Sequence, residues 1–483
     1  MARDLLLSYV GDAWRSTNSR ADDLNPAAPG EVVAVVALAD QELAVEAIAA
    51  AHSAFPAWSR MSAPARGDIL RRAADLLDDR VHEIAREFSR EEGKTLAEAG
   101  GETRRAAAVL RYYAGQTLEP DGETYPSHNA ETLLFARREP VGVVSVLTPW
   151  NFPIAIPAWK IAPALAYGNT VVWKPAELVP LTATHLTQAL IDAGLPPGVL
   201  NMVLGRGSVV GEVLVSDPRV AAVTFTGSNE VGRAVQMRAI GSGKRVQLEM
   251  GGKNPAVVLA DADLELGAEM VARGAFLSTG QKCTATSRVI VEQGALPELQ
   301  ERLVAIAREW RVGDPLHPDT RIGPLSSADQ LQRVLAYFDS ARADGGRFLA
   351  GGVASEGLAG GYFVPPTVID GLGPGNRVAR EEIFGPVVVL LPVASFEDAV
   401  SLANDTPFGL SASVFTRDLG RALRFAREIR AGVVKVNQES AGVEFQVPFG
   451  GAKDSSAGGR EQGKAAREFF TEWKTVYIDS SLA

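Results

Sequence analysis

Covalent chemistry on a carbonyl group needs a nucleophile, and this 483-residue chain has one thiol that could serve. Cys283 is the only cysteine, and small and polar residues surround it in STGQKCTATSR. A buried structural cysteine usually has apolar neighbours, so this context makes Cys283 a candidate nucleophile. A free cysteine also packs as a small hydrophobic residue, and its own neighbours leave that alternative open.

Two further side chains have the types needed to support such a nucleophile. Glu249 precedes Met and two glycines in QLEMGGKNP, so little bulk crowds its carboxylate, which is a candidate general base. Asn151 lies between aromatic residues and prolines in TPWNFP, where a rigidly held amide could donate to an oxyanion. A solvated loop glutamate and a turn-forming asparagine are the ordinary alternatives.

Several residues could bind a nucleotide. FTGSNEVG places Gly227 and Ser228 between an expected strand and helix, where backbone amides could meet a pyrophosphate. The spacing is G-x-x-x-x-G rather than the dinucleotide fingerprint, so plain turn chemistry is an alternative. Lys174 ends the run VVWK and could bind ribose hydroxyls or a phosphate. Glu177 follows at an expected helix start, where the helix dipole alone would stabilise it.

The alternation of short β-branched runs with helical stretches from Pro140 onward predicts βαβ units, which would position these side chains on parallel strands. A second series of this kind begins near Glu249. Residues 1–100 have apolar residues mainly at helical spacing and are expected to be mostly helical. The segments 119–138 and 464–483 interrupt the pattern, as an interface between subunits often does.

Composition argues against other classes of protein. The net charge of −10 disfavours nucleic acid as a partner, and we find neither a signal peptide nor a membrane-spanning run. A single cysteine rules out an intramolecular disulfide and thiolate clusters, which favours a reducing, cytoplasmic location. His82 and Glu83 begin like a zinc motif, but Arg86 stands where a second His is needed, so no metal site is expected.

Seven segments, taken together and in order, resemble the aldehyde dehydrogenase superfamily over nearly the whole chain. They are TPWNFP, VVWKPAE, FTGS, LEMGGKNP, GQKCTA, EEIFGPVV and PFGG. The resemblance implies that Cys283 is the nucleophile, Glu249 the general base, and Asn151 the side-chain donor of an oxyanion hole. Relatives that transfer the acyl group to coenzyme A tend to lack this glutamate, so its presence implies hydrolysis to a free acid.

The resemblance also implies an NAD(P) site. Its residues would be Trp150, Lys174, Glu177, Gly227, Ser228, Glu382 and Phe384. Glu177 suits the ribose diol of NAD and would repel a 2′-phosphate, whereas Lys174 could offset that repulsion. NAD is therefore the expected cofactor, with NADP possible.

The C-terminal part of the chain and GQKCTATSR resemble one group within this family, the α-ketoglutaric semialdehyde (2,5-dioxopentanoate) dehydrogenases, which implies 2-oxoglutarate as product. Glu439 and Ser440 depart from the Pro-Thr common in that group. Alternatives are a dehydrogenase of succinic semialdehyde or of aliphatic or aromatic aldehydes, and a catalytically silent structural or binding homologue. Arg105 and Lys282 are the candidate cations for a substrate carboxylate, and either could instead be a solvated charge.

We therefore expect the α/β architecture of that family: a Rossmann-like cofactor domain, an α/β catalytic domain and a small oligomerisation sheet. The expected NAD(P)-binding domain comprises residues 1–118 and 139–248, and the catalytic domain residues 249–449. The bridging segments 119–138 and 464–483 would mediate a homodimer or homotetramer.

Overall fold

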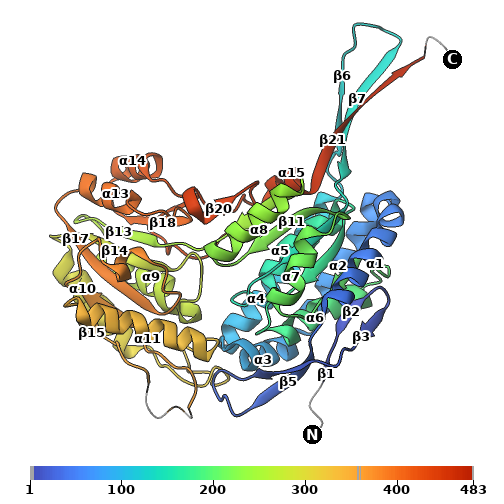
Figure 1. The fold of residues 1–483 in the computed structure, drawn as a ribbon. Helices are drawn as coiled ribbons and strands as arrows, with labels where there is room; N and C mark the ends of the chain where they lie inside the picture. Colours follow the sequence, from blue (N-terminus) through green and yellow to red (C-terminus); the bar gives the residue numbers. More distant parts are fainter. Residues whose placement is uncertain (1–4, 356–357, 359, 481–483) are drawn as a thin grey trace.

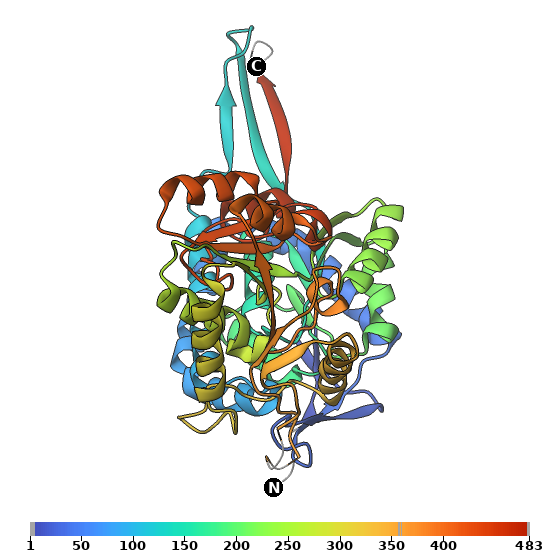
Figure 2. The same cartoon turned by 90° about the vertical axis from the view of Figure 1, so that its left-hand side faces the viewer.

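Two large, mainly parallel sheets with helices on both faces form two lobes, from which a narrow three-stranded arm projects (Figure 1). The computed structural model describes residues 5–355, 358 and 360–480. After a quarter turn the arm stands clear of both lobes (Figure 2).

The N-terminal lobe is built on an eight-stranded sheet with the order β20-β12-β11-β8-β9-β10-β2-β3, in which the strands from β12 to β10 are parallel. The strands are β2 (Ser8–Val10), β3 (Ala13–Arg15), β8 (Val143–Leu147), β9 (Thr170–Lys174), β10 (Leu200–Met202), β11 (Val220–Thr226), β12 (Arg245–Glu249) and β20 (Ser456–Ala457). Its helices are α1 (Gln41–Arg60), α2 (Ala63–Asp79), α3 (Val81–Glu92), α4 (Leu96–Gln116), α5 (Ala155–Ala166), α6 (Pro180–Asp192), α7 (Gly207–Ser216) and α8 (Asn229–Gly241).

The alternation of side chains along β8 explains the two helical layers of this lobe. Val144 and Val146 point into a buried cluster with α2, α4, α5 and α6. Val143 and Leu147 point into a second cluster with α1, α7 and α8. Because both faces of the strand are buried, its sequence is an almost continuous apolar run, as is typical of parallel sheets.

The C-terminal lobe has a seven-stranded sheet with the order β15-β16-β17-β14-β13-β18-β19. The strands are β13 (Asn254–Val258), β14 (Thr286–Glu292), β15 (Arg347–Ala350), β16 (Thr367–Asp370), β17 (Val387–Val393), β18 (Ser411–Phe415) and β19 (Val433–Val436). The helices are α9 (Leu264–Phe276), η1 (Leu277–Gly280), α10 (Leu296–Glu309), α11 (Ala328–Ala343), α12 (Arg377–Arg380), α13 (Phe396–Asn404) and α14 (Leu419–Glu428). Two buried clusters again cover opposite faces of the sheet.

The arm joins two segments that are far apart in the chain. Strand β7 (Thr132–Pro140) pairs antiparallel with β6 (Gly122–Tyr125) on one side and with β21 (Thr471–Asp479) on the other. The pairing with β21 covers all nine residues of β7. Two short turns, η2 (Lys453–Ser455) and η3 (Gly463–Ala465), and helix α15 (Ala466–Phe470) lead into β21.

Most of residues 41–100 are helical, as the sequence predicts, but residues 5–40 contain short strands that the prediction did not include. Helices begin only at Gln41, and the preceding segment contains β2, β3 and a separate small sheet. That sheet consists of β1 (Leu5–Leu6), β4 (Arg20–Leu24) and β5 (Val32–Ala37). Strands of two to six residues are too short to show a clear period of two, which is why the sequence pattern did not predict them.

Within the described part of the chain, no helix combines the length and apolarity needed to cross a membrane. The same residues contain no group of three or more His, Cys, Asp or Glu side chains placed to hold a metal ion.

Candidate active site

A pocket of about 160 Å³ lies where the two lobes meet. The N-terminal lobe contributes the segments that follow the carboxyl ends of β8, β11 and β12, and the C-terminal lobe contributes α11 and the segments that precede β14 and β17. Its lining includes Trp150, Asn151, Thr226, Gly227, Ser228, Met250, Cys283, Gln330, Arg333, Glu382 and Phe384. Carboxyl ends of parallel strands are the usual ligand-binding edge of such sheets.

The nucleophile candidate Cys283 follows a strained turn. Ser278, Thr279 and Gly280 have φ angles of 54°, 53° and 67°, in the left-handed region that costs non-glycine residues free energy. Glu98 compensates by accepting a hydrogen bond from the backbone N–H of Ser278 at 2.6 Å. This hydrogen bond stabilises the turn. Cys283, which follows the turn, is partly exposed and lines the pocket.

The surroundings of Cys283 disfavour its thiolate form. Burial raises the pKa of the thiol to about 12, and the negative charges of Glu382 and Glu249 contribute to the same shift. The thiol is therefore protonated at neutral pH in this structure, and it must lose its proton before it can attack a carbonyl carbon.

Asn151 lies in the same pocket, in the loop between β8 and α5, and is 4% exposed. Its Nδ2 donates a hydrogen bond to the backbone oxygen of Gln281 at 2.9 Å, which ties the amide to the segment that carries Cys283. An amide nitrogen has two N–H groups, so one remains available to an oxygen bound in the pocket.

Glu249 is the last residue of β12 and lies behind the pocket lining rather than on it. Its Oε2 accepts a hydrogen bond from Ser456, its partner across the β12–β20 pairing, whereas its buried Oε1 has no hydrogen-bond partner. Burial raises the pKa of Glu249 well above its usual range, and nearby Glu461 adds to the effect. Lys160 forms an ion pair with Glu461 and opposes the shift.

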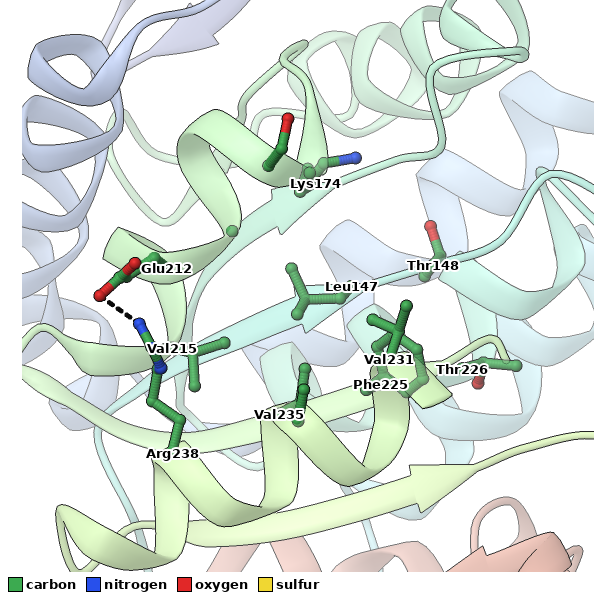
Figure 3. A pocket seen from close by; sticks show the side chains of 14 residues that line it. Leu147, Thr148, Lys174, Glu212, Val215, Phe225, Thr226, Val231, Val235 and Arg238 are labelled. Atoms are coloured by element: carbon green, nitrogen blue, oxygen red, sulfur yellow. Dashed lines mark ion pairs between the residues drawn. The ribbon is translucent and has the colours of Figure 1, made fainter. Parts of the chain in front are cut away.

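A second and larger pocket, of about 550 Å³, lies over the carboxyl ends of β8, β9 and β11 (Figure 3). Leu147, Val215, Phe225 and Val235 give it an apolar surface, and an ion pair between Glu212 and Arg238 lies at its exposed rim. Thr226 lines both pockets, so they adjoin at the end of β11.

Lys174 lines this larger pocket but is not a solvated surface charge. Only 9% of the residue is exposed, and its Nζ donates to the carbonyl oxygen of Pro175 at 2.9 Å. Burial lowers the pKa of Lys174, although the charge of Glu177 opposes this.

Two of the expected nucleotide-binding residues have hydrogen-bond partners within the chain. Glu177 precedes α6 without lying in its first turn, and its carboxylate instead accepts the N–H of Gly207, the first residue of α7, at 2.8 Å. The amide of Gly227 donates to the carbonyl oxygen of Glu249 at 3.1 Å, so it is not free for a pyrophosphate. Ser228 is the N-cap of α8, and it remains at the rim of the smaller pocket.

Glu382 and Phe384 enter the smaller pocket from the segment before β17. Glu382 accepts the N–H of Gly252 at 2.9 Å, and burial raises the pKa of its carboxyl to about 7. The ring of Phe384 contacts Trp150 edge to face, with centroids 5.4 Å apart. Phe384 holds a positive φ of 63°, so this segment is fixed in an uncommon conformation.

Two residues of α11 that the sequence analysis missed hold this segment in place. Gln330 donates to the carbonyl oxygens of Ile383 and Phe384 at 3.1 and 2.8 Å. Arg333 donates to the carbonyl oxygen of Glu382 at 2.9 Å. Their spacing of three puts both on one face of a helix, but no local motif marks that face as part of a site.

The two candidate cations for a substrate do not line either of these pockets. Arg105 donates to the carbonyl oxygen of Val443 and lies 5.9 Å from the ring of Phe445. Lys282 donates to the carbonyl oxygen of Arg273 at 3.0 Å, and burial lowers its pKa to about 8. Neither side chain is a freely solvated charge.

Comparison with known proteins identifies the class to which this fold and site belong. The family model described as "Aldehyde dehydrogenase family" matches residues 14–476, and the chain belongs to this family. The predicted family and fold class are thereby confirmed, and with them the expectation of an aldehyde-oxidising enzyme.

Among curated relatives, the α-ketoglutaric semialdehyde dehydrogenase of Bacillus subtilis is 47% identical over 478 residues, which are 98% of each chain. The 2,5-dioxopentanoate dehydrogenase of Saccharolobus solfataricus is 41% identical over 477 residues, 97% of this chain and 99% of the relative. Among solved structures, the betaine aldehyde dehydrogenase of Staphylococcus aureus in complex with NAD⁺ matches with a TM-score of 0.95 at 34% identity, covering 99% of this chain and 95% of that one.

Proposed function

We propose that this enzyme oxidises an aldehyde to a carboxylate through a thioester on Cys283. One observation carries the proposal: Cys283 and Asn151 share a pocket that adjoins a larger one suited to a dinucleotide. A thiol beside an amide donor is the arrangement that addition to a carbonyl carbon requires.

In the first step the Cys283 thiol gives its proton to solvent water, and its sulfur bonds to the aldehyde carbon. The carbonyl oxygen becomes an oxyanion, to which the Asn151 amide and the Cys283 backbone N–H donate. Loss of hydride from that carbon restores the carbonyl group and leaves a thioester. Glu249 then removes a proton from the water that attacks the thioester, and the carboxylate product leaves while the sulfur is released.

We propose NAD as the cofactor, with NADP as the alternative. When bound, its oxidised nicotinamide accepts the hydride. The larger pocket fits the adenosine end, because it has an apolar surface, Lys174, and the N-terminal turn of α7. Glu382, Phe384 and Trp150 would hold the nicotinamide end beside Cys283, and Ser228 would lie between the two ends. Glu177 already accepts a hydrogen bond at the start of α7, and its charge favours a ribose diol over a 2′-phosphate.

We propose 2,5-dioxopentanoate as the substrate and 2-oxoglutarate as the product. The support is the names of the relatives in Bacillus subtilis and Saccharolobus solfataricus, which match this chain from end to end. Succinic semialdehyde and simple aliphatic or aromatic aldehydes are the alternatives. Comparing kcat/KM for these substrates, each with NAD and with NADP, tests the assignment, and a higher value for a simple aldehyde would overturn it.

Arg105 and Lys282 are the proposed cations for the substrate carboxylate. We would replace Arg105 and Lys282 by Ala, one at a time. Loss of the residue that binds the substrate carboxylate should raise KM for 2,5-dioxopentanoate and leave KM for an uncharged aldehyde unchanged. An equal effect on both substrates would exclude a role in reading the carboxylate.

We further propose a cytoplasmic homodimer or homotetramer assembled through the arm, residues 119–138 with 464–483. The proposed cofactor domain comprises residues 1–118 and 139–248, and the proposed catalytic domain residues 249–449. Exposed apolar side chains on the arm, among them Leu133, Tyr477 and Ile478, support a partner surface there.

The assignment of the three reacting groups is tested by substitution. Cys283→Ala should abolish aldehyde oxidation, because no other thiol exists in the chain. Asn151→Ala should lower kcat about 100- to 1,000-fold, as removal of one oxyanion donor does in other enzymes. Aldehyde-dependent NADH formation by the Cys283→Ala variant would show that Cys283 is not the nucleophile.

A further inference from the structure

A buried cluster of charges lies directly behind Asn151, and the chemistry proposed above does not use it. Its central residue is Lys94, which lies between α3 and α4, and its main partner is Glu102 of α4. The Nζ of Lys94 is 2.7 Å from Glu102 Oε2, and each side chain is 3% exposed. Two charges are rarely buried this deeply unless they are paired, and both members of this pair also contact the loop that carries Asn151.

Lys94 contacts the Asn151 loop at two consecutive residues. Its Nζ donates a hydrogen bond to the backbone oxygen of Asn151. The same ammonium lies 3.9 Å from the centre of the Phe152 ring, within the range of a cation–π interaction. The charged end of Lys94 therefore fixes the orientation of the peptide that links these two residues.

Glu102 fixes the other end of the same loop. Its Oε1 accepts the backbone N–H groups of Ile154 and Ala155, each at 3.2 Å, at the start of α5. A carboxylate at a helix start is stabilised by the unpaired amides and the helix dipole. The Lys94–Glu102 pair therefore holds the loop from Asn151 to Ala155 at both ends.

The charge on Lys94 is stable in this position. Burial alone would lower its pKa, but Glu102 and Glu92 more than offset that effect, and the pKa of Lys94 is raised above its ordinary value. Lys94 thus remains a cationic donor across the pH range in which the enzyme would work.

We infer that Lys94 is a positioning residue for the oxyanion hole: its ammonium holds the Asn151 backbone so that the Asn151 amide is aimed before substrate binds. This inference rests on the proposed role of Asn151 as an oxyanion donor. An error of about 1 Å in the placement of such a donor can lower the rate about 100-fold. A residue that fixes the donor's backbone can therefore affect the rate as much as a residue that contacts the substrate.

The test is a double-mutant cycle with Lys94→Met and Asn151→Ala. We expect Lys94→Met to lower kcat about 10- to 100-fold, less than the loss of the donor itself. Added to Asn151→Ala, the same substitution should lower kcat by no more than about threefold further, because it acts through that amide. Additive losses would overturn the inference. If Asn151→Ala alone left kcat unchanged, the proposed function would fail instead.

Two measurements separate positioning from a general loss of structure. The rate at which iodoacetamide alkylates Cys283 and the Kd for NAD should both stay within about twofold of wild type in Lys94→Met, a change of about 0.4 kcal/mol at most. Because Cys283 is the only cysteine, its alkylation is measured without background. A parallel fall in kcat, alkylation rate and NAD affinity would mean that Lys94 only supports the fold.

Control variants keep the test decisive. Lys94→Arg retains a cationic donor and should recover at least part of the lost kcat. Lys244→Met removes another buried lysine that donates to a backbone carbonyl, that of Asp217. Neither residue lines either pocket, so this variant should leave kcat unchanged. If Lys94→Met fails to fold because Glu102 is left unpaired, the Lys94→Met/Glu102→Gln variant removes both charges, and wild-type kcat in that variant would equally refute the inference.

Discussion

The proposed nucleophile, Cys283, has a protonated thiol in this structure. Burial and two neighbouring carboxylates raise the pKa of Cys283 to about 12, so only a small fraction is thiolate at neutral pH. In the absence of cofactor we expect the rate of alkylation by iodoacetamide to keep rising with pH up to at least pH 9, because thiolate is the reactive form. Mass spectrometry of the single labelled site measures this rate. A plateau below pH 8 would contradict the account.

The contribution of Glu382 to this shift can be tested separately. Its negative charge opposes the thiolate, so Glu382→Gln should lower the pKa of Cys283 and speed alkylation at pH 9, where Glu382 is ionised. Glu381→Gln is a matched control, because the carboxylate of Glu381 pairs with Arg377 at the surface and is not among the groups that shift the pKa of the Cys283 thiol. Equal rates in the two variants would rule out the effect of Glu382.

At the scale of elements, the pairing of β12 with β20 places Ser456 beside Glu249. That hydrogen bond lowers the pKa of Glu249, against the larger effect of burial. A general base acts only when ionised, so kcat should fall as pH falls through the pKa of Glu249 wherever hydrolysis limits the rate. Ser456→Ala removes the bond, raises that pKa further, and should move the acidic limb of the kcat profile to higher pH.

A buried serine without such a bond provides the comparison for this experiment. Ser413 in β18 is buried and its hydroxyl has no hydrogen-bond partner, so Ser413→Ala should leave the pH profile unchanged. An unshifted acidic limb in Ser456→Ala would mean that Glu249 is not the group whose ionisation limits the rate.

The sequence predicted the elements of the site better than the contacts between them. The short β-branched runs from Pro140 onward are predicted to form strands of a parallel sheet, and β8, β9 and β11 are among the strands that the structure has there. A strand that is buried on both faces can be predicted from the sequence, because its residues form a nearly continuous apolar run. The very short strands before Gln41 have no such signature, and tertiary pairing alone defines them.

Contacts between distant residues had no local signal. Lys160 pairs with Glu461 across 301 positions of sequence, and Lys94 reaches Asn151 across 57. Lysine and glutamate side chains are usually solvated, so the local sequence around Lys94, Lys160 and Glu461 does not predict these buried contacts. Glu177 likewise accepts the first N–H of α7 rather than one of α6, the helix that follows it in the sequence.

At the scale of the whole molecule, the proposed reaction uses residues from both lobes. The N-terminal lobe provides Asn151 and the proposed nucleotide pocket, whereas Cys283 comes from the C-terminal lobe. The arm belongs to neither lobe, and its apolar side chains include Tyr477 and Ile478, which are 70% and 50% exposed. Apolar side chains exposed on a projecting sheet are expected to be covered by another subunit.

Assembly through the arm is tested by charging it. The double substitution Tyr477→Asp and Ile478→Asp should reduce the molar mass measured by size-exclusion chromatography with light scattering, because burying unpaired carboxylates at an interface is costly. Leu419→Asp on α14, at a residue 72% exposed, is the control away from the arm. An unchanged mass for the arm variant would place the subunit interface elsewhere.

The most direct test of the account is to trap the acyl group on Cys283. Glu249→Gln removes the proposed base, so after mixing with 2,5-dioxopentanoate and NAD we expect one rapid turnover of NADH and then a slow steady state. Peptide mass spectrometry at that point should find the acyl mass on the peptide that contains Cys283. A full burst of NADH with an unmodified Cys283 peptide, or an acyl group on another residue, would contradict the central claim.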